Sequence, residues 1–306
     1  MEVDTSIHLF RKENINMKPT VVFQTDFGSG GGGVLAGVVK TIDPEVSVYD
    51  FDHNIEPFNI RQSAYQISTM IPYWPSGTIF VSVVDPGVGT HRKSCVAKLK
   101  NGSYVVTPDN GILTSIIDDI VEIRRIDESV NRMPGSENVY IFHGRDVYAY
   151  TAAKLASGLI SYNEVGPQYS LDEITILPLT NIKAEVKEGY ACGGIYNFDV
   201  AYGCCRVNIY NKDFQNIGKF QYGDIVNVTI SDKGKLIFKG KTTYEKAFGY
   251  APRHQPLICG DIQHGDRQML RFTINDHNFI DEYAPFLKNN TDKAVNFKFE
   301  VEKITL

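Results

Sequence analysis

The sequence VSVVDPGVGTHR, from Val81 to Arg92, is the segment around which the rest of the chain is organised. It starts inside an apolar run, Ile79 to Val84, whose length and β-branched content are typical of a buried strand. The run ends on Asp85, and the PGVG that follows favours a tight turn, because proline fixes its own φ and glycine reaches positive φ easily. Asp85 and Arg92 then either face each other across a pocket or form a helix cap and a surface ion pair. Both interpretations remain open at this point.

The bulk composition is that of an ordinary globular protein. The chain has 306 residues, enough for two domains, with 42% hydrophobic and 22% charged residues. A formal net charge of −5 argues against non-specific binding to nucleic acid. The sequence has neither an apolar run as long as a membrane span nor a signal-peptide pattern in its first twenty residues. We therefore expect a protein that binds neither nucleic acid nor membranes.

The cysteines indicate a reduced compartment. There are five, an odd number, and neither a CxxC motif nor a Cys/His metal spacing appears among them. Free buried thiols in a cytoplasmic protein, with no metal site, are the simplest interpretation.

Strands and helices alternate through the first half of the chain. Val21 to Phe27 predicts a strand, Ser29 to Gly33 a glycine loop, and Val34 to Ile42 a helix. Such a loop either cradles an anionic ligand or is simply flexible. Further strands are expected at Val46–Phe51, Thr78–Val84, Ser103–Val106, Val121–Ile126 and Asn138–Phe142, and helices at Ile60–Ile71, Ile112–Ile120 and Asp146–Ser157, the last capped by Gly158. The pattern predicts a Rossmann-like α/β domain with a mostly parallel sheet.

Polar side chains follow the ends of these predicted strands. They are Asp26, Asp52, Asp85, Asp109 and His143. The carboxyl ends of parallel strands share one edge of a sheet, where ligands bind. Some of these residues are expected to be caps or turn formers, and the others to line a site.

The second half of the chain is rich in strands, and its last segment alternates clearly between polar and apolar residues. A DKG sequence at 232–234 predicts a hairpin turn. We expect a loose arm at 1–19, an α/β domain at 20–173, a linker at 174–186 and a smaller β-barrel or sandwich at 187–306.

Several residue types suit chemistry on a nucleoside. Asp26 can accept both hydroxyls of a ribose, because an ionised carboxylate accepts at two oxygens. Asp85, Arg92 and His143 combine an acceptor, a fixed cation and a titratable ring, as water activation requires, although a packed histidine is the simpler reading of His143. In the β domain, Asp199 either binds an ammonium group or forms a turn. Tyr202 either stacks on a base or packs in the core.

Four motifs occur in an order that is known from one family. They are TDFG at 25–28, VVDPGVGTxR at 83–92, TPDNGxLT at 107–114 and FHGRD at 142–146. The chain resembles the S-adenosyl-L-methionine (SAM) hydroxide adenosyltransferases, which hydrolyse SAM to adenosine and methionine and are related to the SAM-dependent fluorinase and chlorinase. The resemblance covers about residues 20–210 well and the remainder loosely.

The resemblance implies a homotrimer that binds SAM between the α/β domain of one subunit and the β domain of its neighbour, and needs neither metal nor cofactor. It implies that Asp85, Arg92 and His143 form the triad that handles the attacking water. The residues it implies for substrate binding are Asp26, which holds the ribose hydroxyls, Phe58, which packs on the sugar, and Asn110, Asp199 and Tyr202. The halogenases have tyrosine at the position of Asp85 and lack the histidine, so the chain is similar to the water-using branch.

Two departures from the family pattern bear on substrate recognition. The glycine loop lacks the usual acidic and aromatic residues, and Cys204 stands where the family has an asparagine that reads adenine. Hydrolysis of SAM is the leading hypothesis. The alternatives are a non-catalytic module that binds adenosine or another nucleoside and, third, a halogenase.

Overall fold

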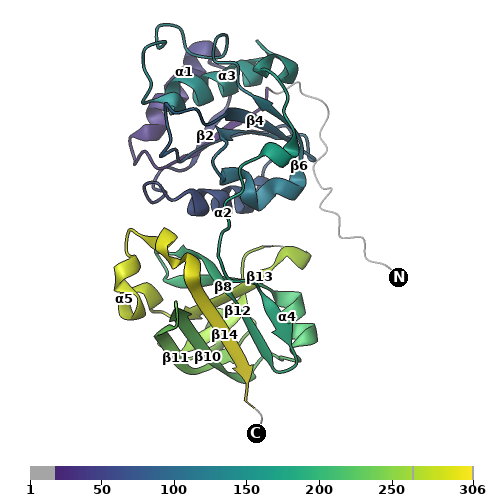
Figure 1. The fold of residues 1–306 in the computed structure, drawn as a ribbon, viewed down its shortest axis with the longest axis vertical. Helices are drawn as coiled ribbons and strands as arrows, with labels where there is room; N and C mark the ends of the chain where they lie inside the picture. The colour runs from purple at the N-terminus through teal and green to yellow at the C-terminus, as the bar shows by residue number, and fades with distance from the viewer. Residues whose placement is uncertain (1–17, 264, 305–306) are drawn as a thin grey trace, which may run out of the picture.

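The protein forms two lobes, each built on its own sheet and its own core (Figure 1). The structure is a computed structural model, and it describes residues 18–263 and 265–304. Most of the arm expected at 1–19 therefore lies outside the described residues. Within the described ranges, no helix combines the length and the apolar character that crossing a membrane requires.

The N-terminal lobe is the sheet with strand order β2-β1-β3-β5-β4-β6, together with its helices. Strands β2, β1, β3 and β5 pair in parallel, whereas β4 runs antiparallel to β5 and β6. Their bounds are β1 Val21–Thr25, β2 Val48–Asp52, β3 Ile79–Val83, β4 Ser94–Leu99, β5 Tyr104–Pro108 and β6 Ile120–Arg125. The mostly parallel α/β sheet expected from the sequence is confirmed, but β4 was not among the predicted strands.

Helices cover both faces of this sheet. Helix α1 (Gly31–Ile42) and helix α3 (Tyr150–Ser157) pack on one face, and α2 (Ile60–Met70) and the 3₁₀ segment η2 (Ile112–Asp119) on the other. Each face of the sheet has its own hydrophobic cluster. Successive residues of a strand point to opposite faces, so Val21 of β1 packs in the cluster under α1 and α3, and Val22 in the cluster under α2 and η2. In Figure 1, α2 lies between the sheet and the other lobe.

The glycine run is helical over most of its length. Helix α1 begins at Gly31, so residues 31–33 form its first turn and are not the predicted loop. A side chain at Gly32 would meet the atoms of Asp50 and His53 at 2.5–2.8 Å, so glycine is needed there for close packing. The predicted five-residue loop is therefore wrong in its extent: only Ser29 and Gly30 lie outside the helix.

Residues 138–142 do not form the predicted strand. The guanidinium of Arg132 donates instead to the carbonyl oxygens of Ser136 and Val139, which fixes this segment as a loop. His143 follows as the N-cap of the π-helical turn η3 (Gly144–Ala149), which continues into α3. Gly158 caps α3 with a φ of 76°, as expected.

The second lobe is a closed barrel, and we call it the barrel lobe. Its strand order is β14-β10-β11-β12-β13-β9-β8-β7, and β14 also pairs with β8, which closes the sheet. The bounds are β7 Glu185–Lys187, β8 Tyr190–Asp199, β9 Cys204–Tyr210, β10 Ile225–Asp232, β11 Lys235–Tyr244, β12 Pro256–Gly260, β13 Met269–Ile274 and β14 Phe297–Lys303, with helices α4 Asn211–Ile217 and α5 Phe279–Tyr283. The β10–β11 hairpin turns at Lys233 and Gly234, both at positive φ, as the DKG sequence predicts. The expected β domain is therefore a barrel.

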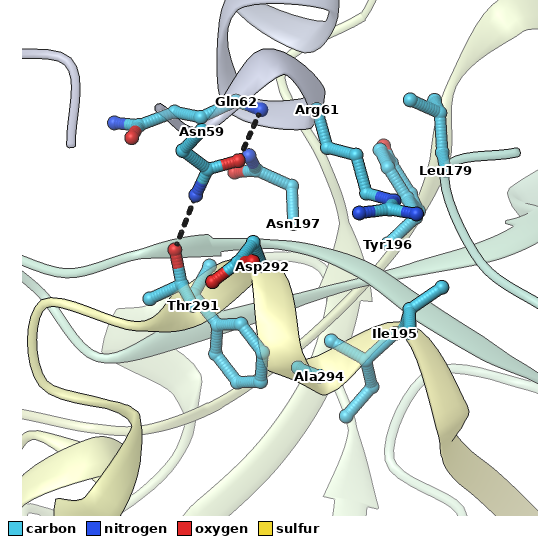
Figure 2. A pocket seen from close by; sticks show the side chains of 12 residues that line it. Asn59, Arg61, Gln62, Leu179, Ile195, Tyr196, Asn197, Thr291, Asp292 and Ala294 are labelled. Carbon is cyan, nitrogen blue, oxygen red and sulfur yellow. Dashed lines mark hydrogen bonds between the residues drawn. The ribbon is translucent and has the colours of Figure 1, made fainter. Parts of the chain in front are cut away.

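The two lobes meet through a polar junction below α2. Asn59 Nδ2 donates to Thr291 Oγ1 at 2.8 Å, a contact that Figure 2 shows, and the backbone N–H of Thr291 donates to the carboxylate of Glu56. The cavity in Figure 2 has a volume of about 10 Å³, room for roughly one water molecule. This junction therefore joins the lobes and is too small to be a substrate site.

Candidate active site

Asp85 and Arg92 face each other at the carboxyl end of β3. The guanidinium Nε of Arg92 donates to Oδ1 of Asp85 at 2.7 Å, and its Nη2 lies 2.5 Å from Oδ2. The side chain of Asp85 is only 5% exposed and that of Arg92 only 10%. Burial and two-point contact distinguish this pair from the surface ion pair that the sequence left open, because paired geometry fixes both the carboxylate and the guanidinium.

His143 completes the cluster from a distant part of the chain. Its Nδ1 lies 3.0 Å from Nη2 of Arg92, and the residue is buried, with 4% exposed. Among the described residues, the two ring nitrogens lie near the guanidinium groups of Arg92 and Arg132 and not near backbone groups, unlike the simple packed histidine considered above. A neutral ring accepts a hydrogen bond from one of the two. The structure thus brings Asp85, Arg92 and His143 together, as the motifs predict, although His143 arrives on a helical turn and not at a strand end.

Two hydroxyl groups support Asp85 and Arg92. Ser94 Oγ accepts from Nη1 of Arg92 at 3.0 Å, and the hydroxyl of Tyr148 donates to Oδ2 of Asp85 at 3.4 Å. Burial raises the pKa of Tyr148 well above its ordinary value, and the charge of Asp85 raises it further. The phenol therefore stays protonated and serves Asp85 as a hydrogen-bond donor.

A second ion pair, which sequence reasoning missed, lies on the other side of His143. Nη2 of Arg132 is 3.0 Å from Nε2 of His143 and 2.5 Å from Oε2 of Glu128. The other carboxylate oxygen of Glu128 accepts from Ser94 Oγ at 3.2 Å. Glu128 and Arg132 both lie in the loop after β6. Their spacing in the sequence matches no known site motif, so the sequence carries no signal that would mark them as site residues.

Asp26 and Phe58 lie together beside this cluster. The backbone N–H of Phe58 donates to Oδ2 of Asp26 at 3.0 Å, and Phe58 has a φ of 67° and a side chain that is 71% exposed. Burial raises the pKa of Asp26; the Phe58 bond opposes this rise, and the charge of Asp85 adds to it. Asp26 is thus near enough to Asp85 to feel its charge, and the Phe58 bond occupies Oδ2.

Asn110 lies at the base of the site. Its Nδ2 donates to the carbonyl oxygen of Val84 at 2.9 Å, next to Asp85 in the chain. Its buried Oδ1 has no hydrogen-bond partner within residues 18–263 and 265–304. Asn110 therefore fixes the end of β3 through its Nδ2, and its Oδ1 is an unpaired acceptor among the described residues.

The remaining strand-end aspartates have structural partners. Asp52 accepts from the backbone of Asn54 and from Gln66, and Asp109 from the hydroxyl of Tyr169 and the backbone of Thr175. Asp52 therefore stabilises a local turn and Asp109 holds a neighbouring segment, which are ordinary structural roles of aspartate at a strand end. The strand-end pattern thus located the site without separating site residues from scaffold.

Asp199 and Tyr202 lie on the barrel lobe, at the end of β8. Asp199 pairs with Nη2 of Arg206 at 3.2 Å, and Tyr202 is 70% exposed. Tyr202 lines a cavity of about 300 Å³ with Cys204, Phe248, Thr273 and His277 among its other walls. Across the described part of the chain, no hydrogen bond or ion pair joins Asp199 or Tyr202 to Asp85, Arg92 or His143. The triad and the Asp199–Tyr202 segment therefore lie on different lobes of the chain.

Cys204 is fully buried, and its thiol lies 3.2 Å from the hydroxyl of Thr273. The five cysteines are free and buried. Among the residues that the structure describes, no group of three or more His, Cys, Asp or Glu side chains is arranged to hold a metal ion.

The N-terminal lobe, which carries the buried Asp-Arg-His cluster, matches a known family model. Residues 21–166 match the family model for the SAM hydroxide adenosyltransferase N-terminal domain. This lobe is therefore similar over nearly its whole length to the SAM hydroxide adenosyltransferase N-terminal domain.

Curated relatives agree with this similarity, and a solved structure has a similar fold. The chain is 39% identical over 143 residues to the (R)-S-adenosyl-L-methionine hydrolase of Methanocaldococcus jannaschii and 36% identical over 172 residues to that of Thermus thermophilus. These alignments cover 44% and 53% of this chain and 52% and 66% of the two hydrolases, so the chain spans about half to two thirds of their length. It is also 27% identical to a fluorinase from an Actinoplanes species, over 66% of this chain and 76% of that protein. The crystal structure of an uncharacterized conserved protein from Thermotoga maritima superposes with a TM-score of 0.76 at 28% identity, covering 93% of this chain and all of the other.

Proposed function

We propose that the protein hydrolyses SAM to adenosine and L-methionine, with water attacking C5′ of the ribose. The observation that carries the proposal is the buried contact of Arg92 with both Asp85 and His143 on a lobe that matches this family's N-terminal domain. The curated relatives named as SAM hydrolases support the same substrate.

The chemistry makes few demands on the protein. An O–C5′ bond forms, the C5′–S bond breaks with its electron pair going to sulfur, and one proton is released as the sulfonium charge is lost. The sulfonium is already a good leaving group, so the protein must supply a positioned water with hydroxide character. Arg92 stabilises that developing charge, while Asp85 and His143 fix the guanidinium and orient the water.

Substrate contacts are proposed for both lobes. Asp26 accepts the ribose hydroxyls through the oxygen that Phe58 leaves free, and the exposed ring of Phe58 packs on the sugar. Asn110 binds the substrate from the end of β3, where its Nδ2 holds the carbonyl oxygen of Val84. Asp199 binds the ammonium group of the methionine moiety, and Tyr202 stacks on the base in its cavity.

We propose a homotrimer in which the barrel lobe of one subunit completes the site of its neighbour. The location of Tyr202 and the triad on different lobes of the chain supports this arrangement. So do the large exposed side chains of Phe58, whose backbone binds Asp26, and Ile141, two residues before His143, which are 71% and 83% exposed. Free, buried cysteines suit the cytoplasmic location that we propose.

Incubation with SAM, followed by chromatography for adenosine and methionine, tests the proposal. The expected result is one adenosine for each methionine formed. Unchanged SAM, while one of the known hydrolases turns over under the same conditions, would contradict it. Only adenosine is expected in high chloride, because Asp85 and His143 occupy the positions at which the halogenases differ.

One observation favours a second candidate, a non-catalytic nucleoside-binding module. Cys204 provides only a weak hydrogen-bonding group where the family has an asparagine that reads adenine. Calorimetry with adenosine separates the two candidates: tight binding without any turnover of SAM supports the module.

A further inference from the structure

Glu128 and Arg132 extend the triad into a closed circuit of side chains. Starting from Arg92, the contacts run through His143, Arg132, Glu128 and Ser94 and return to Arg92, at distances of 3.0, 3.0, 2.5, 3.2 and 3.0 Å. Arg132 is 11% exposed, so this second guanidinium is nearly as buried as that of Arg92. His143 is thus held between two arginines, each of which is paired with a carboxylate.

The available hydrogens determine which form of His143 fits this position. A guanidinium only donates hydrogen bonds, and a neutral imidazole has one nitrogen that accepts and one that donates. A protonated ring has no acceptor at all. The neutral ring therefore accepts from one of the two guanidinium groups, and protonation would remove that acceptor and put three cations in contact.

We propose that Arg132, held in place by Glu128, is a positioning residue that keeps His143 neutral and orients its ring against Arg92. The catalytic consequence rests on the proposed function: the imidazole accepts a hydrogen bond and does not take up the proton that the attacking water releases. The protonation state of His143 itself can be measured without any substrate.

The charged groups that face His143 agree with this role. Burial lowers the pKa of the imidazole, and the charges of Arg92 and Arg132 lower it further, while those of Glu128 and Asp85 raise it. Removing Arg132 therefore takes away a lowering effect, and removing Glu128 takes away a raising one. The two substitutions should move the pKa of His143 in opposite directions.

Nuclear magnetic resonance of the imidazole signals of full-length protein tests the proposal, with the His143 signal assigned from a His143→Gln variant. The wild-type pKa should lie below the ordinary value for histidine. Arg132→Gln should raise it by about one pH unit, and Glu128→Gln should lower it. Arg132→Lys keeps the cation and should hold the pKa near that of the wild type.

Two results would overturn the proposal: a pKa of His143 that Arg132→Gln leaves unchanged in folded protein, or a shift of the same sign in both variants. Glu128→Gln keeps the test valid if Arg132→Gln does not fold, because Arg132 also holds the loop at 136–139. An upward shift of the acid limb of kcat in Arg132→Gln, reversed by Arg132→Lys, is the catalytic readout. The expected pKa shifts in a protein that leaves SAM unchanged would refute only the proposed hydrolysis.

Discussion

The guanidinium of Arg92 meets the carboxylate of Asp85 at two points, Nε to Oδ1 at 2.7 Å and Nη2 to Oδ2 at 2.5 Å. The turn between β3 and β4 makes this possible, because it reverses the chain within the PGVG segment and returns Arg92 to the end of the strand that Asp85 follows. Nη1 and Nη2 then also reach Ser94 and His143. One guanidinium therefore organises the whole cluster.

Replacing Arg92 with lysine should reduce kcat by about 100-fold or more. Lysine keeps the charge but loses the planar fork that contacts Asp85, Ser94 and His143 at once. The rate of adenosine formation measures the effect. Arg124→Lys is the matched control, since Arg124 is also a largely buried arginine and pairs with Glu122 on β6 instead. Equal losses in the two variants would mean that Arg92 acts only through general stability.

Replacing Asp26 with asparagine should stabilise the ligand-free protein near neutral pH while weakening substrate binding. Burial raises the pKa of Asp26 above 3.8, so the folded state favours the protonated form and loses stability as pH rises through that raised value. The neutral amide avoids this loss, so the gain should vanish below pH 3.8. Thermal unfolding at acidic and neutral pH measures it.

The same variant should raise KM for SAM by about tenfold, because the single oxygen of a neutral amide must serve either the Phe58 N–H or the ribose hydroxyls, and accepts more weakly than a carboxylate. Asp52→Asn changes the neighbouring strand end, where the carboxylate binds only local groups, and should leave KM unchanged. A less stable Asp26→Asn protein at neutral pH would show that the carboxylate is held by contacts other than those described.

Tyr202→Ala should raise KM by about tenfold if the base stacks on the phenol ring. Tyr202 is 70% exposed, so its truncation should cost the barrel little stability. Cys204→Ala in the same cavity should change kcat/KM very little, because a thiol is a weak hydrogen-bonding group. The reverse ranking of the two variants would place the base elsewhere.

Two impaired variants should restore each other, at SAM concentrations below the raised KM of Tyr202→Ala, if the site is shared between subunits. Asp85→Ala removes the triad from one subunit, and Tyr202→Ala weakens the barrel half of the site. After subunits are exchanged, mixed oligomers should contain intact sites, and activity should exceed the sum of the separate proteins. Light scattering measures the oligomer size. A monomer, or no recovery after proven exchange, would contradict a shared site.

Much of the fold could be predicted because its strongest patterns are local. β1, β3 and α2 follow from apolar runs and helical periodicity within a few residues of the predicted bounds. β4 was missed although Asn101 and Gly102 form the dipeptide that most favours a tight hairpin between β4 and β5. The apolar content of 138–142 favoured a strand, but the carbonyl oxygen of Val139 binds Arg132, a contact that no local pattern reveals.

The candidate site was predictable where motifs carry it. Asp85, Arg92 and His143 converge, whereas Asp52 and Asp109, which look the same in sequence, serve turns and tethers. Glu128 and Arg132 were missed because their relation to His143 exists only in three dimensions. The charged neighbours of His143 come from other segments of the chain, so the FHGRD motif alone does not predict the protonation state of its ring.

The most direct test of the central claim is hydrolysis of SAM in water enriched in the heavy oxygen isotope, with mass spectrometry of both products. Attack at C5′ by the water that Asp85, Arg92 and His143 position predicts adenosine with the heavy isotope at its 5′ hydroxyl, and unlabelled methionine. Unlabelled adenosine, or the same labelled product at an undiminished rate from the Arg92→Lys variant, would contradict it.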